Sequence, residues 1–385
     1  MRRYRGLAAC FAMLSLGTGV VACGGASKSS TSQAGTTSAS SGVNASYLEQ
    51  ARADVAKARQ PLTKFLGPTE SPGPVPPKKQ LVAITCSPSP FCIQAAQATK
   101  AAAQMLGWDT RIVQGDGSPP SWVNAVDSAI SSGADAIVLN SADPITMPQA
   151  IAKAKRAGIP VVATGVCEKP PAGVINTVDI PGKPDYGASL GSLLAEWIAQ
   201  RSPDGAKLLE LTSPAFFCLT IPQKAFEQGI AKAGPAFQIV AHQDTPLTDI
   251  GSQQGVQRQV SMLRAHPDAS YFYIQTSSWA PTFQQALQVS QKTGKVTGVG
   301  INGNNFISQI RDGFPQVLVG ADSRNYGFAA VDSLIRYFNH KPQQIYKNLG
   351  LQLIDKDNAA DTQGDEVTAK YDLPAAWGKL WGVSK

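Results

Sequence analysis

The chain has 385 residues, of which 43% are hydrophobic and only 16% are charged, so its composition is globular and excludes a disordered protein. About 300 residues outside the low-complexity N-terminal stretch are too many for one compact core and predict two domains. The formal net charge is +7, but the Lys and Arg residues are scattered. They form no basic stripe interleaved with aromatic residues, which argues against a nucleic-acid partner.

The N-terminal 22 residues have the pattern of a secretory signal peptide. The basic segment Arg2-Arg3-Tyr4-Arg5 precedes an apolar stretch, residues 6–21, that is short for a membrane span. The stretch ends in Val20-Val21-Ala22-Cys23, which resembles the bacterial lipobox. This resemblance implies that residues 1–22 are removed, that the net charge falls to 7 − 3 = +4, and that a lipidated Cys23 anchors the protein outside the cytoplasm. A simple secretory signal and an uncleaved anchor are the alternatives, and both give the same compartment.

A flexible tether and a short helix follow the signal. Residues 23–45 are mostly Ser, Thr, Gly and Ala, which bury too little apolar surface to fold. Residues 47–65 are predicted to be a helix, because apolar residues recur every three or four positions, and five prolines between 68 and 77 form a second linker. The sequence leaves open whether this unit, residues 46–78, docks on the folded body or on a partner.

From residue 79 the pattern alternates between strands and helices. The run of residues 79–85 is continuously apolar, as in a strand buried on both faces. Further strands are predicted at 108–113, 136–139 and 161–163, with helices at 92–105, 122–131 and 148–156. Such alternation predicts a parallel sheet with helices on both faces and right-handed crossovers.

A second set of alternating elements begins after residue 186. Strands are predicted at 206–211, 237–240, 271–274, 296–301 and 316–320, and helices at 187–200, 223–233, 251–264, 281–293, 306–312 and 327–339. The predicted fold class is therefore α/β, with two doubly wound parallel-sheet lobes.

Five sequence blocks occur in a characteristic order: residues 133–139 with Asp143-Pro144, then 154–162, 185–187, 226–229 and 298–303. Together they resemble the type I periplasmic binding proteins, the family of the ribose- and galactose-binding proteins, over residues 79–356. The resemblance implies a three-crossover hinge near residues 176–180, 320–324 and 351–354. Lobe one would then comprise residues 79–178 plus 324–351, and lobe two residues 179–323 plus 352–385. It also implies a monomeric solute-binding protein of an ABC importer, whose lobes close around a small neutral solute for recognition by a membrane permease.

In open α/β sheets, ligands bind beyond the carboxyl ends of the strands, which selects the loops for the site. These loops combine aromatic residues with amides and hydroxyls and carry few charges, a mixture suited to sugars. The predicted ligand-binding residues are Ser87, Phe91, Asn140, Asp143, Thr164, Phe216, Phe217, Gln275, Thr276, Trp279, Asn302, Asn304, Asp322 and Arg324.

Some positions depart from the ribose-type pattern. Thr164-Gly165-Val166-Cys167 stands where that pattern has an Asp-Arg pair, Thr220-Ile221-Pro222-Gln223 stands where it has an Arg, and Asn302 replaces an Asp. A simple aldose is thereby put in doubt, and an aromatic or alicyclic neutral compound is the alternative ligand. A polyanion is disfavoured, because Arg324 is the only well-placed cation.

Six cysteines are present, with Cys10 in the signal and Cys23 in the lipobox. The other four lie in an oxidising compartment and allow three connectivities. We favour a Cys86–Cys92 bridge, which would stiffen the loop that presents Phe91. The family mapping places Cys167 and Cys218 on opposite lobes, where a bridge would restrain opening, so we expect free thiols or small apolar contacts there.

The sequence bears on two other function classes, an enzyme and a ligand sensor. An enzyme is disfavoured because no G-x-G-x-x-G, P-loop or G-x-S-x-G motif occurs and no histidine lies beside a candidate nucleophile. The Cys and His spacings fit no zinc pattern, so no metal or cofactor is expected. The same fold senses ligands in some repressors, but a signal peptide occupies the place of their DNA-binding segment. A ligand sensor that signals to a membrane partner stays open beside an importer component.

Overall fold

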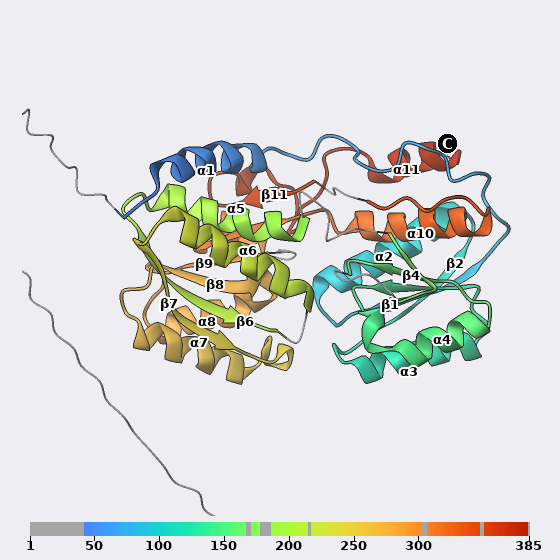
Figure 1. Ribbon diagram of the computed structural model, residues 1–385, viewed down its shortest axis with the longest axis horizontal. Helices are drawn as coiled ribbons and strands as arrows, with labels where there is room; N and C mark the ends of the chain where they lie inside the picture. The colour runs from blue at the N-terminus through green and yellow to red at the C-terminus, as the bar shows by residue number, and fades with distance from the viewer. Residues whose placement is uncertain are drawn as a thin grey trace, which may run out of the picture. The chain divides into compact units, whose positions relative to one another are not determined.

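The computed structural model describes residues 42–166, 171–177, 186–214, 217–301, 306–346 and 350–383. Two sheets alternate with helices as the sequence predicts (Figure 1). The first sheet has strand order β2-β1-β3-β4-β5 and is parallel throughout. Its elements are β1 (Gln80–Thr85), α2 (Pro90–Met105), β2 (Asp109–Val113), α3 (Pro119–Ser131), β3 (Ala136–Asn140), η1 (Pro144–Thr146), α4 (Pro148–Arg156), β4 (Val161–Thr164) and β5 (Val174–Asn176).

The second sheet has strand order β11-β10-β9-β8-β6-β7, with only the β10–β11 pair antiparallel among the described strands. Its elements are α5 (Tyr186–Arg201), β6 (Ala206–Thr212), α6 (Phe217–Ala233), β7 (Phe237–Asp244), η2 (Leu247–Asp249), α7 (Gln253–Ala265), β8 (Tyr271–Thr276), η3 (Ser277–Trp279), α8 (Ala280–Val289), β9 (Thr297–Ile301), α9 (Ile307–Arg311), β10 (Gln316–Gly320) and β11 (Gln352–Ile354). We call the first sheet with its helices lobe one and the second lobe two.

The central strands are buried on both faces, which explains their continuous apolar runs. Every residue of β3 is buried, as is every residue of β10. Helices therefore cover both faces of each sheet, and alternation between apolar and polar residues is absent from these strands. The apolar run, rather than periodicity, is the signal that located them.

Helix α10 (Arg324–Phe338) follows β10 in the chain but packs on α2 of lobe one. Gly327 permits this approach, since a Cβ at that position would lie 2.3 Å from Thr99 N. The chain thus returns to lobe one after β10, as a hinge of several crossovers requires.

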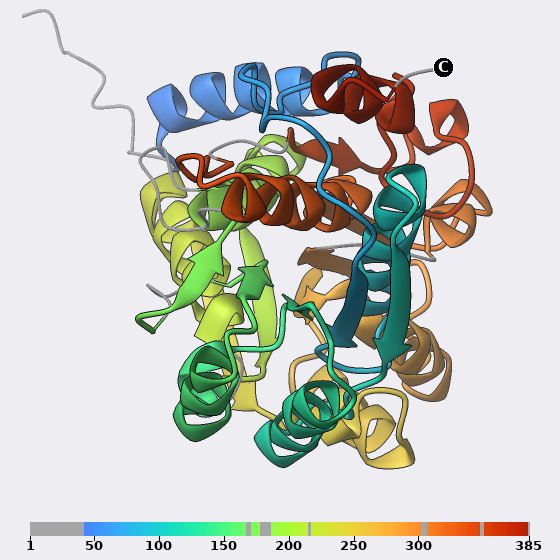
Figure 2. The same ribbon diagram turned by 90° about the vertical axis from the view of Figure 1, so that its right-hand side faces the viewer.

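The C-terminal helix α11 (Leu373–Trp381) also packs on α10 (Figure 2). Trp381 donates its indole N–H to Asp332 Oδ1 at 3.0 Å, and its ring stacks on Phe328. The sequence boundaries assigned residues 352–385 to lobe two, whereas α11 lies against the lobe-one helix. The apolar face of α11 packs on the aromatic surface of α10, and the order of elements along the chain does not predict this contact.

The N-terminal helix α1 (Ala45–Ala58) is shorter than the predicted 47–65 helix. Arg59 forms the C-cap, and Pro61 follows two residues later. Proline lacks the N–H for a helical hydrogen bond and disfavours the helical conformation in the preceding residue, so the helix ends before it. Within the described residues, no helix is both long and apolar enough to span a membrane.

Candidate functional site

The carboxyl ends of the lobe-one strands bring two predicted site residues, Asn140 and Thr164, side by side with Thr85. In the parallel register, Thr85 lies opposite Asn140, and Asn140 lies opposite Thr164. Asn140 is fully buried, and the protein occupies both ends of its amide: Oδ1 accepts from Thr99 Oγ1 at 3.3 Å, and Nδ2 donates to Ile84 O at 3.4 Å. Asn140 therefore connects α2 to the sheet edge and supports the site from behind.

Thr164 differs from Asn140 because its hydroxyl has no partner. The side chain is buried, and Oγ1 makes no hydrogen bond. An unpaired buried hydroxyl costs about 1–3 kcal/mol, which a ligand oxygen or amide at this strand end would recover.

The loop after β1 is held by a disulfide between Cys86 and Cys92, with Cα atoms 5.7 Å apart, and the predicted bridge is confirmed. Inside this loop, Ser87 Oγ accepts from Ser89 N at 3.2 Å. Ser89 in turn caps α2. Phe91 is half-buried and packs edge-on against Tyr326 of α10, with ring centroids 5.4 Å apart. The bridge, the cap and Tyr326 together fix Ser87 in the loop and Phe91 in the first turn of α2.

The lobe-two strand ends offer a matching pair of unpaired hydroxyls. Ser213 follows β6, Thr276 ends β8, and neither Ser213 Oγ nor Thr276 Oγ1 has a hydrogen-bond partner. Gln275, fully buried, joins these two strands, since its Oε1 accepts from Ser213 N at 2.8 Å. Its φ of 56° lies in the left-handed region, and the register of β8 against β9 shifts between Tyr273 and Thr276 around this residue.

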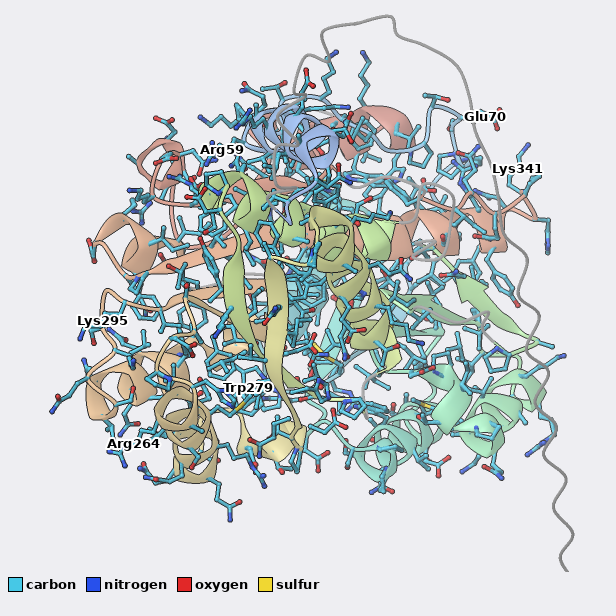
Figure 3. All side chains as sticks on the ribbon, turned by 60° about the vertical axis from the view of Figure 1, so that its left-hand side comes forward. Arg59, Glu70, Arg264, Trp279, Lys295 and Lys341 are labelled. Atoms are coloured by element: carbon cyan, nitrogen blue, oxygen red, sulfur yellow. A yellow bond between two sulfur atoms is a disulfide. The ribbon has the colours of Figure 1, made fainter. Side chains whose placement is uncertain are left out.

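Trp279 lies in the interior of lobe two (Figure 3). It is fully buried in an apolar cluster with Val256, Phe272 and Phe283, and its indole N–H has no partner. This burial favours a packing role that supports the β8 loop over direct contact with a ligand.

Asp322 and Arg324, predicted to contact ligand, pair with each other. Arg324 Nε and NH2 donate to the two carboxylate oxygens of Asp322 at 2.8 and 2.5 Å. Asp322 is almost completely buried and also accepts from Ala369 N at 3.0 Å. The hydrogen bond to Asp322 raises the pKa of the Arg324 guanidinium above its ordinary value. The cation is thus neutralised within the protein, which removes the charge that an anionic ligand would need.

Other predicted residues fall elsewhere. Asp143 caps the turn of η1 by accepting from Ile145 N at 3.0 Å, a local role. Phe216, Asn302, Asn304 and the lipobox Cys23 lie outside the described residues, as does the side chain of Phe217. The grouping of these positions with the strand-end hydroxyls stays a prediction.

The expectation of a free thiol at Cys218 is wrong, because this residue is disulfide-bonded. Cys86 and Cys92 pair with each other, so the other half of the Cys218 bridge is not among the described cysteines. Cys218 Sγ lies 3.7 Å from Gly165 O, directly after β4. The first turn of α6 in lobe two therefore contacts the loop after β4 of lobe one, so assignment to opposite lobes does not keep Cys218 away from lobe one.

Sequence reasoning missed two residues near these strand ends. Gln94 on α2 hydrogen-bonds to Ser323, at the start of α10. Tyr326 packs on Phe91 and lies close to Gly165, whose added Cβ would be 3.3 Å from its ring. Neither residue follows a strand in the chain, so the strand-end rule could not select them.

The fold and the sequence agree on the family. The periplasmic binding protein domain model matches residues 81–342. The chain belongs to this family. It is 26% identical over 199 residues to the Escherichia coli ABC transporter periplasmic-binding protein YphF, covering 51% of this chain and 59% of that protein.

The ribose import binding protein RbsB of Escherichia coli is 23% identical over 218 residues, covering 56% of this chain and 69% of that protein. The chain thus spans between about three fifths and two thirds of the length of these relatives. A solved ABC transporter solute-binding protein from Mycobacterium smegmatis, with bound glycerol, has a TM-score of 0.64 at 23% identity. That comparison covers 78% of this chain and all of the other, and it shows a shared fold.

Proposed function

We propose that this protein is the extracytoplasmic solute-binding component of an ABC importer and that it binds a small neutral sugar or sugar-like ligand between its lobes. The observation that carries the proposal is the set of three unpaired buried hydroxyls, Thr164, Ser213 and Thr276, at strand ends of both sheets. Both lobes end their strands in groups that need a partner, and a polyol carries hydroxyls that pair with them.

The charge balance supports a neutral ligand. Asp322 and Arg324 neutralise each other, and the hydroxyl and amide groups are uncharged. The half-buried ring of Phe91 adds an apolar face on which a sugar's C–H groups or an alicyclic ring would pack. Ribose, arabinose and allose are therefore the first compounds to test, since similar proteins are a ribose import binding protein and solute-binding proteins solved with D-arabinose and D-allose.

Anchoring by a lipidated Cys23 is the second part of the proposal, and it rests on the lipobox pattern. In this view the protein captures solute outside the cytoplasm and delivers it to a membrane permease. A Cys23→Ser variant should move from the membrane fraction to the soluble fraction, whereas Cys10→Ser should stay in the membrane. Equal fractionation of both variants would rule out anchoring at Cys23.

Thermal melts of residues 40–385, which form one compact unit, test ligand binding. A ligand at 100 times its dissociation constant adds about 2.7 kcal/mol to the free energy of unfolding. We expect that to raise Tm by roughly 5–10 °C with one class of sugar. Thr164→Val should abolish most of the shift, while Thr146→Val, an exposed threonine in η1, should retain it. A shift only with alicyclic or aromatic compounds would replace the sugar class with the alternative, and no shift would refute solute binding from this panel.

A further inference from the structure

Residues 42–79, here called the strap, precede the part of the chain that the family model matches, which begins at residue 81. The strap contains α1 and the proline-rich linker. Its contacts fall into three consecutive segments: one on lobe two, one on the β11 region near the hinge, and one on lobe one. Figure 3 marks Arg59 at the end of α1 and Glu70 farther along the strap.

The first segment is docked by apolar packing. Leu48, Ala51 and Val55 of α1 are buried, and α1 contacts both α5 and α6 of lobe two. The entry to the helix is fixed as well, since Asn44 N donates to Ala233 O at 2.8 Å and Ala236 N donates to Gly42 O at 3.0 Å. This segment moves with lobe two.

The second segment is held by polar contacts around a cavity. Arg59 pairs with Asp355 and Asp357 directly after β11, and Lys370 N donates to Leu62 O at 2.8 Å. A cavity of about 410 Å³ lies along this seam, lined by residues that include Arg59, Gln352, Asn358 and Lys370. Asp355 is 1% exposed, so its ion pair with Arg59 holds this part of the strap to the segment after β11. The pair with Asp357, which is 42% exposed, is the contact that rearranges at low cost.

The third segment is docked on lobe one. Arg336 of α10 donates to Glu70 O, and Asn339 Nδ2 donates to Pro72 O at 3.1 Å and to Pro74 O at 2.7 Å. Trp108 Nε1 donates to Pro76 O at 3.2 Å. Closely spaced prolines favour an extended, semi-rigid chain, so this segment has little slack.

We propose that the strap is a further connection between the lobes, which crosses the hinge and biases the protein toward the arrangement in which both ends of the strap are docked. Rotation of one lobe against the other must strain or release one end. The strap also packs on the lobe-one side through Phe65, whose ring lies 5.2 Å from that of Trp377. Beyond Phe65, residues 70–76 depend on hydrogen bonds, so they release before α1, which buries an apolar face. The inference concerns lobe motion and does not depend on which solute binds.

The test uses residues 40–385 without ligand, carrying a specific protease site inserted after Thr69. The same protein is compared before and after cleavage at that site. Lobe motion is measured by electron paramagnetic resonance, as the distance between two spin labels carried by non-natural amino acids. The labels replace Lys155 on α4 and Gln257 on α7, which are both exposed and lie one in each lobe. Cleavage should raise about tenfold the fraction of molecules whose label distance differs from that of the docked arrangement. This change is equivalent to about 1.4 kcal/mol. A matched nick in the exposed loop after Thr293 should leave the distances unchanged.

Asn339→Ala, which removes two hydrogen bonds and cuts no chain, is the second variant and should shift the same distribution in the same direction. The proposal is overturned if cleavage and Asn339→Ala both leave the distribution unchanged. It is also overturned if the Thr293 nick broadens the distribution as much as the strap cut, because the effect would then belong to any break in the chain.

Discussion

Asp355 offers the sharpest test of how the region around α1 is stabilised. Its side chain is 1% exposed, and its Oδ2 accepts from Trp197 Nε1 at 2.6 Å, from Arg201 NH2 at 3.3 Å and from Arg59. Its Oδ1 accepts from Asp357 N at 2.9 Å. One carboxylate therefore joins α1, α5 and the segment after β11.

Asp355→Asn keeps the shape and removes the charge. Breaking a buried ion pair by removing one partner costs about 3–5 kcal/mol. We expect the lower end, about 3 kcal/mol, because Arg59 and Arg201 are 23% and 30% exposed and both keep Asp357 as a partner. Urea unfolding should show this loss, together with a fall in Tm of roughly 6 °C.

Asp357→Asn is the matched control, because Asp357 binds the same two arginines but is 42% exposed. Its loss should be about 0.5 kcal/mol. Equal losses for the two variants would refute the argument that burial makes Asp355 the central partner.

The pH dependence gives a second check on Asp355. Burial raises the pKa of this carboxyl, but hydrogen bonds from Arg59 and Trp197 outweigh it, and the pKa is lowered overall. The stabilisation is therefore complete above the unfolded pKa of about 3.9 and is lost as the pH falls through the folded pKa. The difference between wild type and Asp355→Asn should shrink below about pH 4, and a constant difference down to pH 2 would contradict this assignment.

Three further predictions concern single contacts. Burial, and then repulsion from Asp54, raises the pKa of Glu196 to about 7, so stability should fall as the pH rises from about 4.5 to 7. Glu196→Gln should flatten this pH dependence and raise the free energy of unfolding by about 2 kcal/mol at pH 8, measured by urea unfolding. An unchanged pH dependence would contradict the assignment to Glu196. Gly327→Ala should lower the free energy of unfolding by about 2–3 kcal/mol, because the added Cβ separates α10 from α2. The control Lys100→Ala, at an exposed position of α2, should lower it by less than about 0.5 kcal/mol. Similar losses for the two variants would mean that the close approach of the helices is unimportant. Replacing Cys86 and Cys92 together by Ser should lower stability by about 2 kcal/mol and weaken ligand-induced Tm shifts, whereas intact shifts would mean that the loop needs no bridge.

Much of the fold was determined by local sequence pattern. Continuous apolar runs located strands such as β1 and β3, because strands covered on both faces need apolar residues at every position. The strand-end rule then selected Thr164, Thr276 and the Cys86–Cys92 loop, since parallel strands present their carboxyl ends along one edge.

Only the tertiary structure decided which of those groups are already satisfied. Asn140 and Thr164 end neighbouring strands and look equivalent in the sequence, but α2 supplies a partner to Asn140 and none to Thr164. Trp279 looked like a ligand-binding aromatic, and the surfaces of α7 and α8 bury it. The docking of α1 likewise depends on Arg59, Arg201 and Asp355, which are far apart in the chain. The local sequence pattern specifies how each segment folds against its own sheet. These contacts instead form between surfaces of segments that are far apart in the chain, and such contacts leave no periodic pattern in the local sequence.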